Sequence, residues 1–272
     1  MPFTPSHAVV ALPFLRTPLV PAAIAVGAMT PDLPVFLRGL GLPYSTTHSF
    51  AWLPLTVLLA LALLLVWRCV LRPATRELSP RWLAARLPEG WDASAVASAR
   101  ETLAIVGDAP GRRVSWRGLT MLVLSLALGV VSHIAWDLFT HEGRAGVTAF
   151  PMLEETWGPL TGYKWLQHGS SVLGLTIIGI WMLVWLARRE PDASVTSRAP
   201  RVLPAGVRLA WWLSLPALLV AAWFGGLAVL GPFDDRFTIA HLAYRVLPPA
   251  CAVWGVLTLL LCLVVQGLRH RR

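Results

Sequence analysis

Five long apolar stretches constrain what this chain can fold into. They cover residues 51–70, 119–139, 170–187, 209–230 and 246–268. A helix needs about 20 mostly apolar residues to cross a bilayer, and each stretch reaches or approaches that length. Only 14% of the 272 residues are charged, whereas soluble domains carry about 25%. We predict an all-α fold, a polytopic membrane helical bundle with about five transmembrane helices in a single domain, residues 1–272.

The basic residues are distributed unevenly between these stretches. Of the 23 Lys and Arg residues, 17 fall within 68–117, within 188–208 or after Leu268. Because cytoplasmic loops are enriched in Lys and Arg, this pattern predicts a bacterial multi-pass cell-membrane protein with its N-terminus outside and its C-terminus in the cytoplasm. Residues 73–118 are then a cytoplasmic insert with surface helices, and 188–208 a cytoplasmic linker.

The net charge of +9 has more than one explanation. Basic residues beside apolar spans indicate topology before they indicate nucleic-acid binding. We therefore expect the lipid bilayer, not nucleic acid, as a partner. The basic face of the insert is either solvated, lies on the lipid surface, or recognises an acidic lipid or protein.

The first 50 residues contain a shorter apolar stretch that prolines interrupt. Helices over 6–15 and 19–30 would each be about 15 to 18 Å long at 1.5 Å per residue, with a turn at Arg16, Thr17 and Pro18. Irregular backbone at membrane depth is tolerated where it lines a cavity or is buried in protein. We predict a re-entrant N-terminal hairpin, followed by a ligand loop, within residues 1–50.

Histidine and aspartate recur at helical spacing in the second apolar stretch. His133, Asp137 and His141 are four residues apart, so they lie on one face of a helix. Ionisable side chains are costly in a membrane and usually have a function there. Imidazole and carboxylate together suit zinc, with manganese or iron as alternatives. A hydrogen-bonded packing role remains the alternative for an isolated histidine.

Four more residues are candidate metal ligands because the predicted topology brings them to the same, outer side. Each has an ordinary alternative, as a helix cap or an interfacial residue; His168 is the weakest of the four. A nearby carboxylate could serve as general base or hold a ligand in place. The ligand candidates are His7, Asp32, His48 and His168, and the carboxylates are Glu142, Glu154 and Glu155.

Several of these motifs resemble a known family. The residues that carry the resemblance are 1–8, 27–37, 47–49, 132–141 and 170–174. They resemble an uncharacterised bacterial integral-membrane family, domain of unknown function 4184. That family is similar to predicted membrane-bound metal-dependent hydrolases of the LexA-regulated type, and more faintly to zinc-dependent phospholipase C. The resemblance is strongest over about the first 175 residues. It implies that His7, Asp32, His48, His133, Asp137 and His141 are metal ligands.

These observations predict a metal-dependent membrane hydrolase, with zinc as the expected divalent metal. Its substrate would be a phosphoester or ester of a lipid or lipid-linked molecule at the outer face of the membrane. The alternative is a non-catalytic metal-binding membrane protein or a transporter. A transporter needs ligands near mid-membrane, whereas these candidates gather at one end of the spans.

Overall fold

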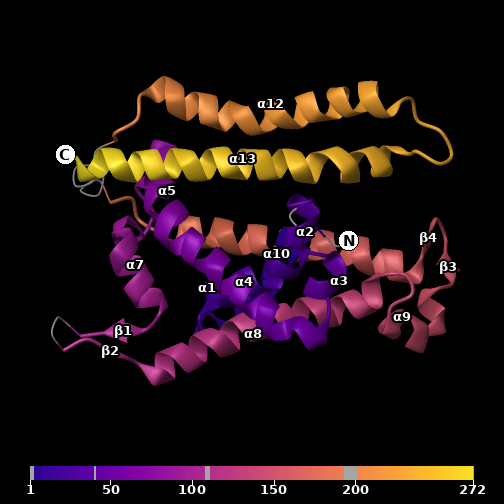
Figure 1. The fold of residues 1–272 in the computed structure, drawn as a ribbon, viewed down its shortest axis with the longest axis horizontal. Coiled ribbons are helices and arrows are strands. Elements are labelled where there is room, and N and C mark those ends of the chain that lie inside the picture. Colours follow the sequence, from indigo (N-terminus) through magenta and orange to yellow (C-terminus); the bar gives the residue numbers. More distant parts are fainter. Residues whose placement is uncertain (1–2, 40, 108–110, 193–200, 272) are drawn as a thin grey trace. The chain divides into compact units, whose positions relative to one another are not determined.

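The computed structural model describes residues 3–39, 41–107, 111–192 and 201–271, and it is almost entirely helical (Figure 1). Five helices are long and apolar enough to cross a membrane, which confirms the predicted fold class. Large apolar side chains remain exposed along them, and Val229, for example, is 83% exposed. Such faces need a lipid environment, as in a multi-pass membrane protein. The five spans are Phe50–Leu78, Trp116–Thr140, Gly162–Ala187, Ala205–Leu230 and Ile239–His270.

The chain divides into two compact units. The first unit comprises Met1–Leu33, Pro43–Val66 and Val96–Glu190. The second unit comprises Pro34–Leu42, Trp67–Ala95 and Pro191–Arg272. The linker predicted at 188–208 includes residues 193–200, and the predicted insert includes 108–110; both short stretches lie outside the described residues.

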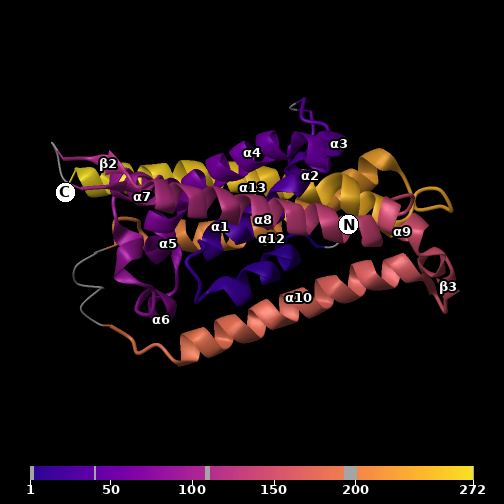
Figure 2. The same ribbon diagram turned by 90° about the horizontal axis from the view of Figure 1, so that it is seen from below.

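The first unit is built around helix α8. The N-terminal segment, which consists of η1 and α1, and helix α10 pack beside it (Figure 2). Two short antiparallel β-hairpins, β1–β2 and β3–β4, precede α8 and α10. Its elements, with 3-10 helices written η, are η1 (Thr4–Phe14), α1 (Pro21–Met29), η2 (Thr30–Asp32), α3 (Tyr44–Thr47), η3 (Phe50–Trp52), α4 (Leu53–Val66), α7 (Ala95–Thr102), β1 (Ile105–Val106), β2 (Arg113–Val114), α8 (Trp116–Thr140), α9 (Ala145–Ala149), η6 (Pro151–Leu153), β3 (Thr156–Trp157), β4 (Leu160–Thr161) and α10 (Gly162–Ala187).

The N-terminal segment forms a helical hairpin where the prolines predict one. Helices η1 and α1 pack against each other, and their bounds lie within a few residues of the expected 6–15 and 19–30. Pro21 begins α1 at the position where a missing N–H costs least. The backbone N–H of Val20, just before it, donates to Ser125 Oγ of α8 at 2.9 Å.

Two glycines allow α1 and α8 to touch through their backbones. A Cβ atom on Gly27 would collide with the Leu126 carbonyl, and one on Gly129 would collide with the Ile24 carbonyl. Small residues permit this close approach between membrane helices. The crossing brings the C-terminal end of α1 directly against the helical turn that follows Gly129.

The second unit contains the antiparallel pair α12 (Ala205–Leu230) and α13 (Ile239–His270), visible in Figure 1. Its apolar core holds Ala74, Leu78, Leu203, Cys262 and Val265. The remaining elements are α2 (Leu33–Phe36), which begins at the boundary of the units, the π-helical turn Trp67–Leu71, α5 (Arg72–Leu78), α6 (Arg81–Ala84) and η5 (Glu89–Asp92).

The start of the predicted insert differs from a solvated face. The first span continues through α5, and Arg72, Arg76 and Glu77 are buried there. Arg76 donates to Asp92 at 2.8 Å and to the carbonyls of Leu87 and Pro88 at 3.0 Å. Arg76 is thus buried with partners from the insert itself, whereas the partners of Glu77 come from a later part of the chain.

Candidate metal centre

Four side-chain atoms from three segments of the first unit meet at one point. His48 Nε2 and His133 Nε2 lie 3.1 Å apart. Asp32 Oδ1 is 3.6 Å from each of these nitrogens. Asp137 Oδ2 is 3.4 Å from His48 Nε2 and 3.5 Å from His133 Nε2. All four residues are buried.

These separations match the spacing of ligands around a small divalent ion. Zinc takes nitrogen and oxygen ligands at about 2.0 to 2.2 Å in a tetrahedron, so neighbouring ligand atoms should be about 3.3 to 3.6 Å apart. The five separations given above, from 3.1 to 3.6 Å, fall close to that range. The four atoms therefore fit the donor set of a single N2O2 centre.

Hydrogen bonds to the backbone fix which nitrogen of each imidazole faces the centre. His133 Nδ1 lies 2.6 Å from the Ala28 carbonyl oxygen, and His48 Nδ1 lies 3.1 Å from the Tyr44 carbonyl oxygen. A carbonyl only accepts, so both Nδ1 atoms carry the proton and donate it. The two Nε2 atoms then present lone pairs toward each other, an arrangement that calls for a cation between them.

Charge balance leads to the same conclusion. Asp32 is 1% exposed and Asp137 is 3% exposed, and burying carboxylates is costly unless they are paired or bind a metal. Their ion-pair partners among the described residues are all histidines. A single divalent cation would balance both carboxylates.

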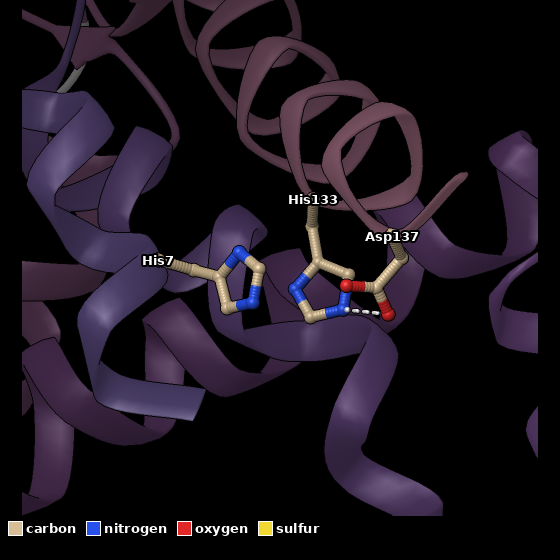
Figure 3. A group of neighbouring side chains, drawn as sticks. All are labelled: His7, His133 and Asp137. Carbon is tan, nitrogen blue, oxygen red and sulfur yellow. Dashed lines mark ion pairs between the residues drawn. The ribbon is translucent and has the colours of Figure 1, made fainter. Parts of the chain in front are cut away.

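His7 joins this group from the other side of His133. Its ring stacks on that of His133 with centroids 4.0 Å apart. His7, His133 and Asp137 offer ligand atoms that all lie within 4.8 Å of one another, and Figure 3 shows the three side chains converging from η1 and α8. His7 Nε2 is buried without a hydrogen-bond partner among the described residues, so it is a candidate fifth donor.

Burial and neighbouring groups set the protonation of the site residues outside the spans. Burial lowers the pKa of His7 to about 4, so this imidazole is neutral at pH 7 and can bind a metal. Burial raises the pKa of Asp32, but its side-chain partners, among them the Thr4 hydroxyl, outweigh burial and hold that pKa below its ordinary value. Asp32 is therefore ionised.

The remaining predicted residues lie outside these four- and five-residue sets. His141 ends α8, and its Nδ1 is 3.5 Å from Asp137 Oδ2, but its Nε2 is buried without a hydrogen-bond partner among the described residues. His168 is exposed on α10. Glu142, Glu154 and Glu155 are also exposed, and Glu142 accepts a hydrogen bond from Tyr163 at 3.3 Å.

Three supporting residues were not expected from the sequence. The Thr4 hydroxyl donates to Asp32 Oδ2 at 2.6 Å. Tyr44 stacks on His48 with ring centroids 3.6 Å apart, and its hydroxyl donates to Asp137 Oδ2 at 3.4 Å. Arg144 lines a small recess together with His48 and Asp137. Only spacing could have indicated Thr4 and Tyr44, which precede His7 and His48 by three and four residues.

Comparison with known proteins identifies a family but no activity. No curated protein and no solved structure matches the chain. The pattern of one family matches residues 1–268 and thus extends well beyond the first 175 residues. This match shows that the chain belongs to the DUF4184 family, described as a domain of unknown function.

Proposed function

We propose that this protein is a metal-dependent hydrolase of the bacterial cell membrane that cleaves a phosphoester or ester of a lipid or lipid-linked substrate. The observation that carries the proposal is the pair of imidazole nitrogens, His48 Nε2 and His133 Nε2, which lie 3.1 Å apart and are flanked by two buried carboxylates. Zinc is the expected metal, because the four donor atoms are spaced for tetrahedral nitrogen and oxygen ligands.

The chemistry divides between the metal and the surrounding residues. A divalent metal bound there would polarise a phosphoryl or acyl oxygen and lower the pKa of a bound water to about 7. Asp32 and Asp137 would hold the ion, and Thr4 and Tyr44 would orient these two carboxylates by hydrogen bonding. Arg144, which lies beside His48 and Asp137, would attract the negative charge that develops on a substrate oxygen.

His7 is the reason for proposing a catalytic metal site and not only a structural one. Four protein ligands complete a tetrahedron, whereas a catalytic zinc keeps an open position or expands to five ligands. His7 Nε2 has no hydrogen-bond partner among the described residues, and His7, His133 and Asp137 together offer three ligand atoms within 4.8 Å of one another. A metal held by these three residues would keep a fourth position for water or a substrate oxygen.

The orientation of the protein is also part of the proposal. With the N-terminus outside and the C-terminus cytoplasmic, the site lies at the outer ends of the first two spans, at the level of lipid headgroups. Reporter fusions at Arg188 should then give cytoplasmic signals, and fusions at Glu154 should give external ones. The reverse pattern would move the site to the cytoplasmic face.

The decisive experiment combines metal analysis with an activity screen. The full chain, purified in detergent, should contain a stoichiometric transition metal. It should hydrolyse at least one phosphoester or ester lipid, lose that activity with a chelator, and regain it when the metal is restored. Bound metal without hydrolysis, together with metal flux into proteoliposomes, would favour a transporter; absence of metal would overturn the proposal.

A further inference from the structure

An apolar groove of about 490 Å³ lies between η1, α8 and α10 in the first unit. Pockets for small molecules typically measure about 300 to 1,000 Å³, so the groove can hold a single small ligand. Its walls are mainly hydrocarbon, from Val9, Val10, Pro13, Trp136, Leu173 and Ile177.

The polarity of the groove changes along its length. On η1, Ser6 and His7 precede the apolar residues Val9, Val10 and Pro13. On α10, Ser170 precedes Leu173 and Ile177 in the same way. From residue 170 to 177 the helix rises about 10 Å. The segments η1 and α10 are parallel here, because the Phe3 N–H donates to Ser171 Oγ and Ser6 lies against Gly174. These two walls therefore run from a polar end to an apolar end in the same direction.

The floor of the groove forms where η1 meets α10. A Cβ atom on Gly174 would lie 2.9 Å from the Ser6 carbonyl oxygen, so only glycine allows this approach. Trp136 of α8 donates to Ser170 Oγ at 3.1 Å and joins the other two helices at the polar end. The groove is thus a built feature of three packed elements.

His7 connects the groove with the metal centre. It lines the groove, stacks on His133 and is 9% exposed. Its Nε2 lacks a hydrogen-bond partner among the described residues. A molecule lying in the groove with its polar end beside His7 would therefore place that end next to the donor atoms of the centre.

We infer that the groove binds one hydrocarbon chain of an amphiphile, with the polar headgroup beside His7 and the chain end near Pro13 and Ile177. This inference rests on the proposed function and specifies its substrate class: a lipid recognised through a single acyl or alkyl chain. Because burying apolar surface is favourable, affinity should rise about fourfold with each added methylene until the groove is full.

The inference can be tested by photocrosslinking of the full chain in detergent. Two long-chain alkyl phosphates serve as probes, one with a diazirine at the end of the chain and one with a diazirine beside the phosphate. Peptide mapping should place the chain-end label near Pro13 or Ile177 and the phosphate-end label near Ser6 or Ser170. Labelling spread evenly over the exposed spans, or the reverse order, would overturn the inference.

Matched variants distinguish probe binding in the groove from unspecific binding to the lipid-facing surface. Leu173→Trp fills the groove and should lower labelling at least tenfold. Leu175→Trp introduces the same change two residues away on α10, outside the groove lining, and should leave labelling unchanged. Equal losses in both variants would contradict a specific groove.

Metal analysis of the same samples distinguishes this inference from the proposed function. Metal present with unlocalised labelling would reject the groove and leave the centre intact. Localised labelling without metal would retain the groove and reject the hydrolase. A matching pair of alkyl acetate probes, with the same chains, shows whether the headgroup is preferred as a phosphate or as a carboxylic ester.

Discussion

The two units each bury acidic residues, but they satisfy them in opposite ways. In the second unit Glu77 accepts from the backbone N–H groups of Val202 and Leu203 at 3.0 and 3.1 Å. Its carboxylate also lies 3.4 Å from Arg208 and 3.7 Å from Arg269. In the first unit the two carboxylates meet only histidines among their described ion-pair partners.

This contrast separates a structural network from a candidate binding site. A buried carboxylate with donors and cations around it is complete, and it joins the segments that contribute those groups. A pair of buried carboxylates facing imidazole lone pairs lacks positive charge, and a metal ion can supply it. Variants of the two clusters should therefore differ in their effect on metal content.

Removing two ligands should have the largest effect on metal content. The double change His133→Ala and Asp137→Ala deletes one nitrogen and one oxygen donor from α8. We expect the purified protein to lose its metal completely, as measured by elemental mass spectrometry. Unchanged metal content would show that the ion, if any, is bound elsewhere.

A change in the helix crossing should disturb the centre without altering a ligand. Gly129→Leu should force α8 away from α1, because even a Cβ atom added at residue 129 would collide with the Ile24 carbonyl oxygen. His133 then loses its position against the Ala28 carbonyl, and most of the metal should be lost. Gly179→Leu is the control, since a Cβ there meets nothing within 4 Å. Equal metal content in both variants would argue against the crossing as the support of the site.

Residues that only orient the ligands should have smaller effects. Tyr44→Phe removes the hydroxyl that donates to Asp137 but keeps the ring that stacks on His48. Loss of such a supporting partner typically weakens metal affinity about 10- to 100-fold, and we expect the lower end of that range in competition with a chelating dye. An affinity equal to that of the unaltered protein would place Tyr44 in a packing role.

Glu77 should have no effect on the metal. Glu77→Ala leaves Arg208 and Arg269 without their buried partner, which typically destabilises a protein by about 3 to 5 kcal/mol. Thermal unfolding in detergent should shift downward while metal content per folded protein stays the same. If this variant does not accumulate, Glu77→Gln provides the milder test. Metal loss in either variant would mean that the two clusters are not independent.

Much of the fold could be predicted because hydropathy and proline positions determine where helices form and end from the local sequence alone. The five spans follow from apolar length, and the N-terminal hairpin follows from prolines that interrupt an apolar stretch. The observed spans are longer than predicted, since helices continue past the apolar stretches; α10 begins at Gly162, eight residues before residue 170.

The candidate site could be predicted only in part. Spacing brings His133 and Asp137 to one face, and the hairpin brings His7 and Asp32 toward them. The sequence places His168 beside the site because the third span is expected to begin after it, whereas His168 lies within α10 and is exposed. The roles of Thr4 and Tyr44 depend on tertiary contacts that no local pattern encodes.

The four candidate ligands come from positions far apart along the chain. They are Asp32, His48, His133 and Asp137. During biosynthesis the N-terminal hairpin leaves the ribosome long before α8 exists, so more than a hundred further residues follow Asp32 before His133 and Asp137 appear. Under the proposed function, metal capture would therefore be a late event in the maturation of this protein, and it would report that the hairpin and α8 have found each other in the membrane.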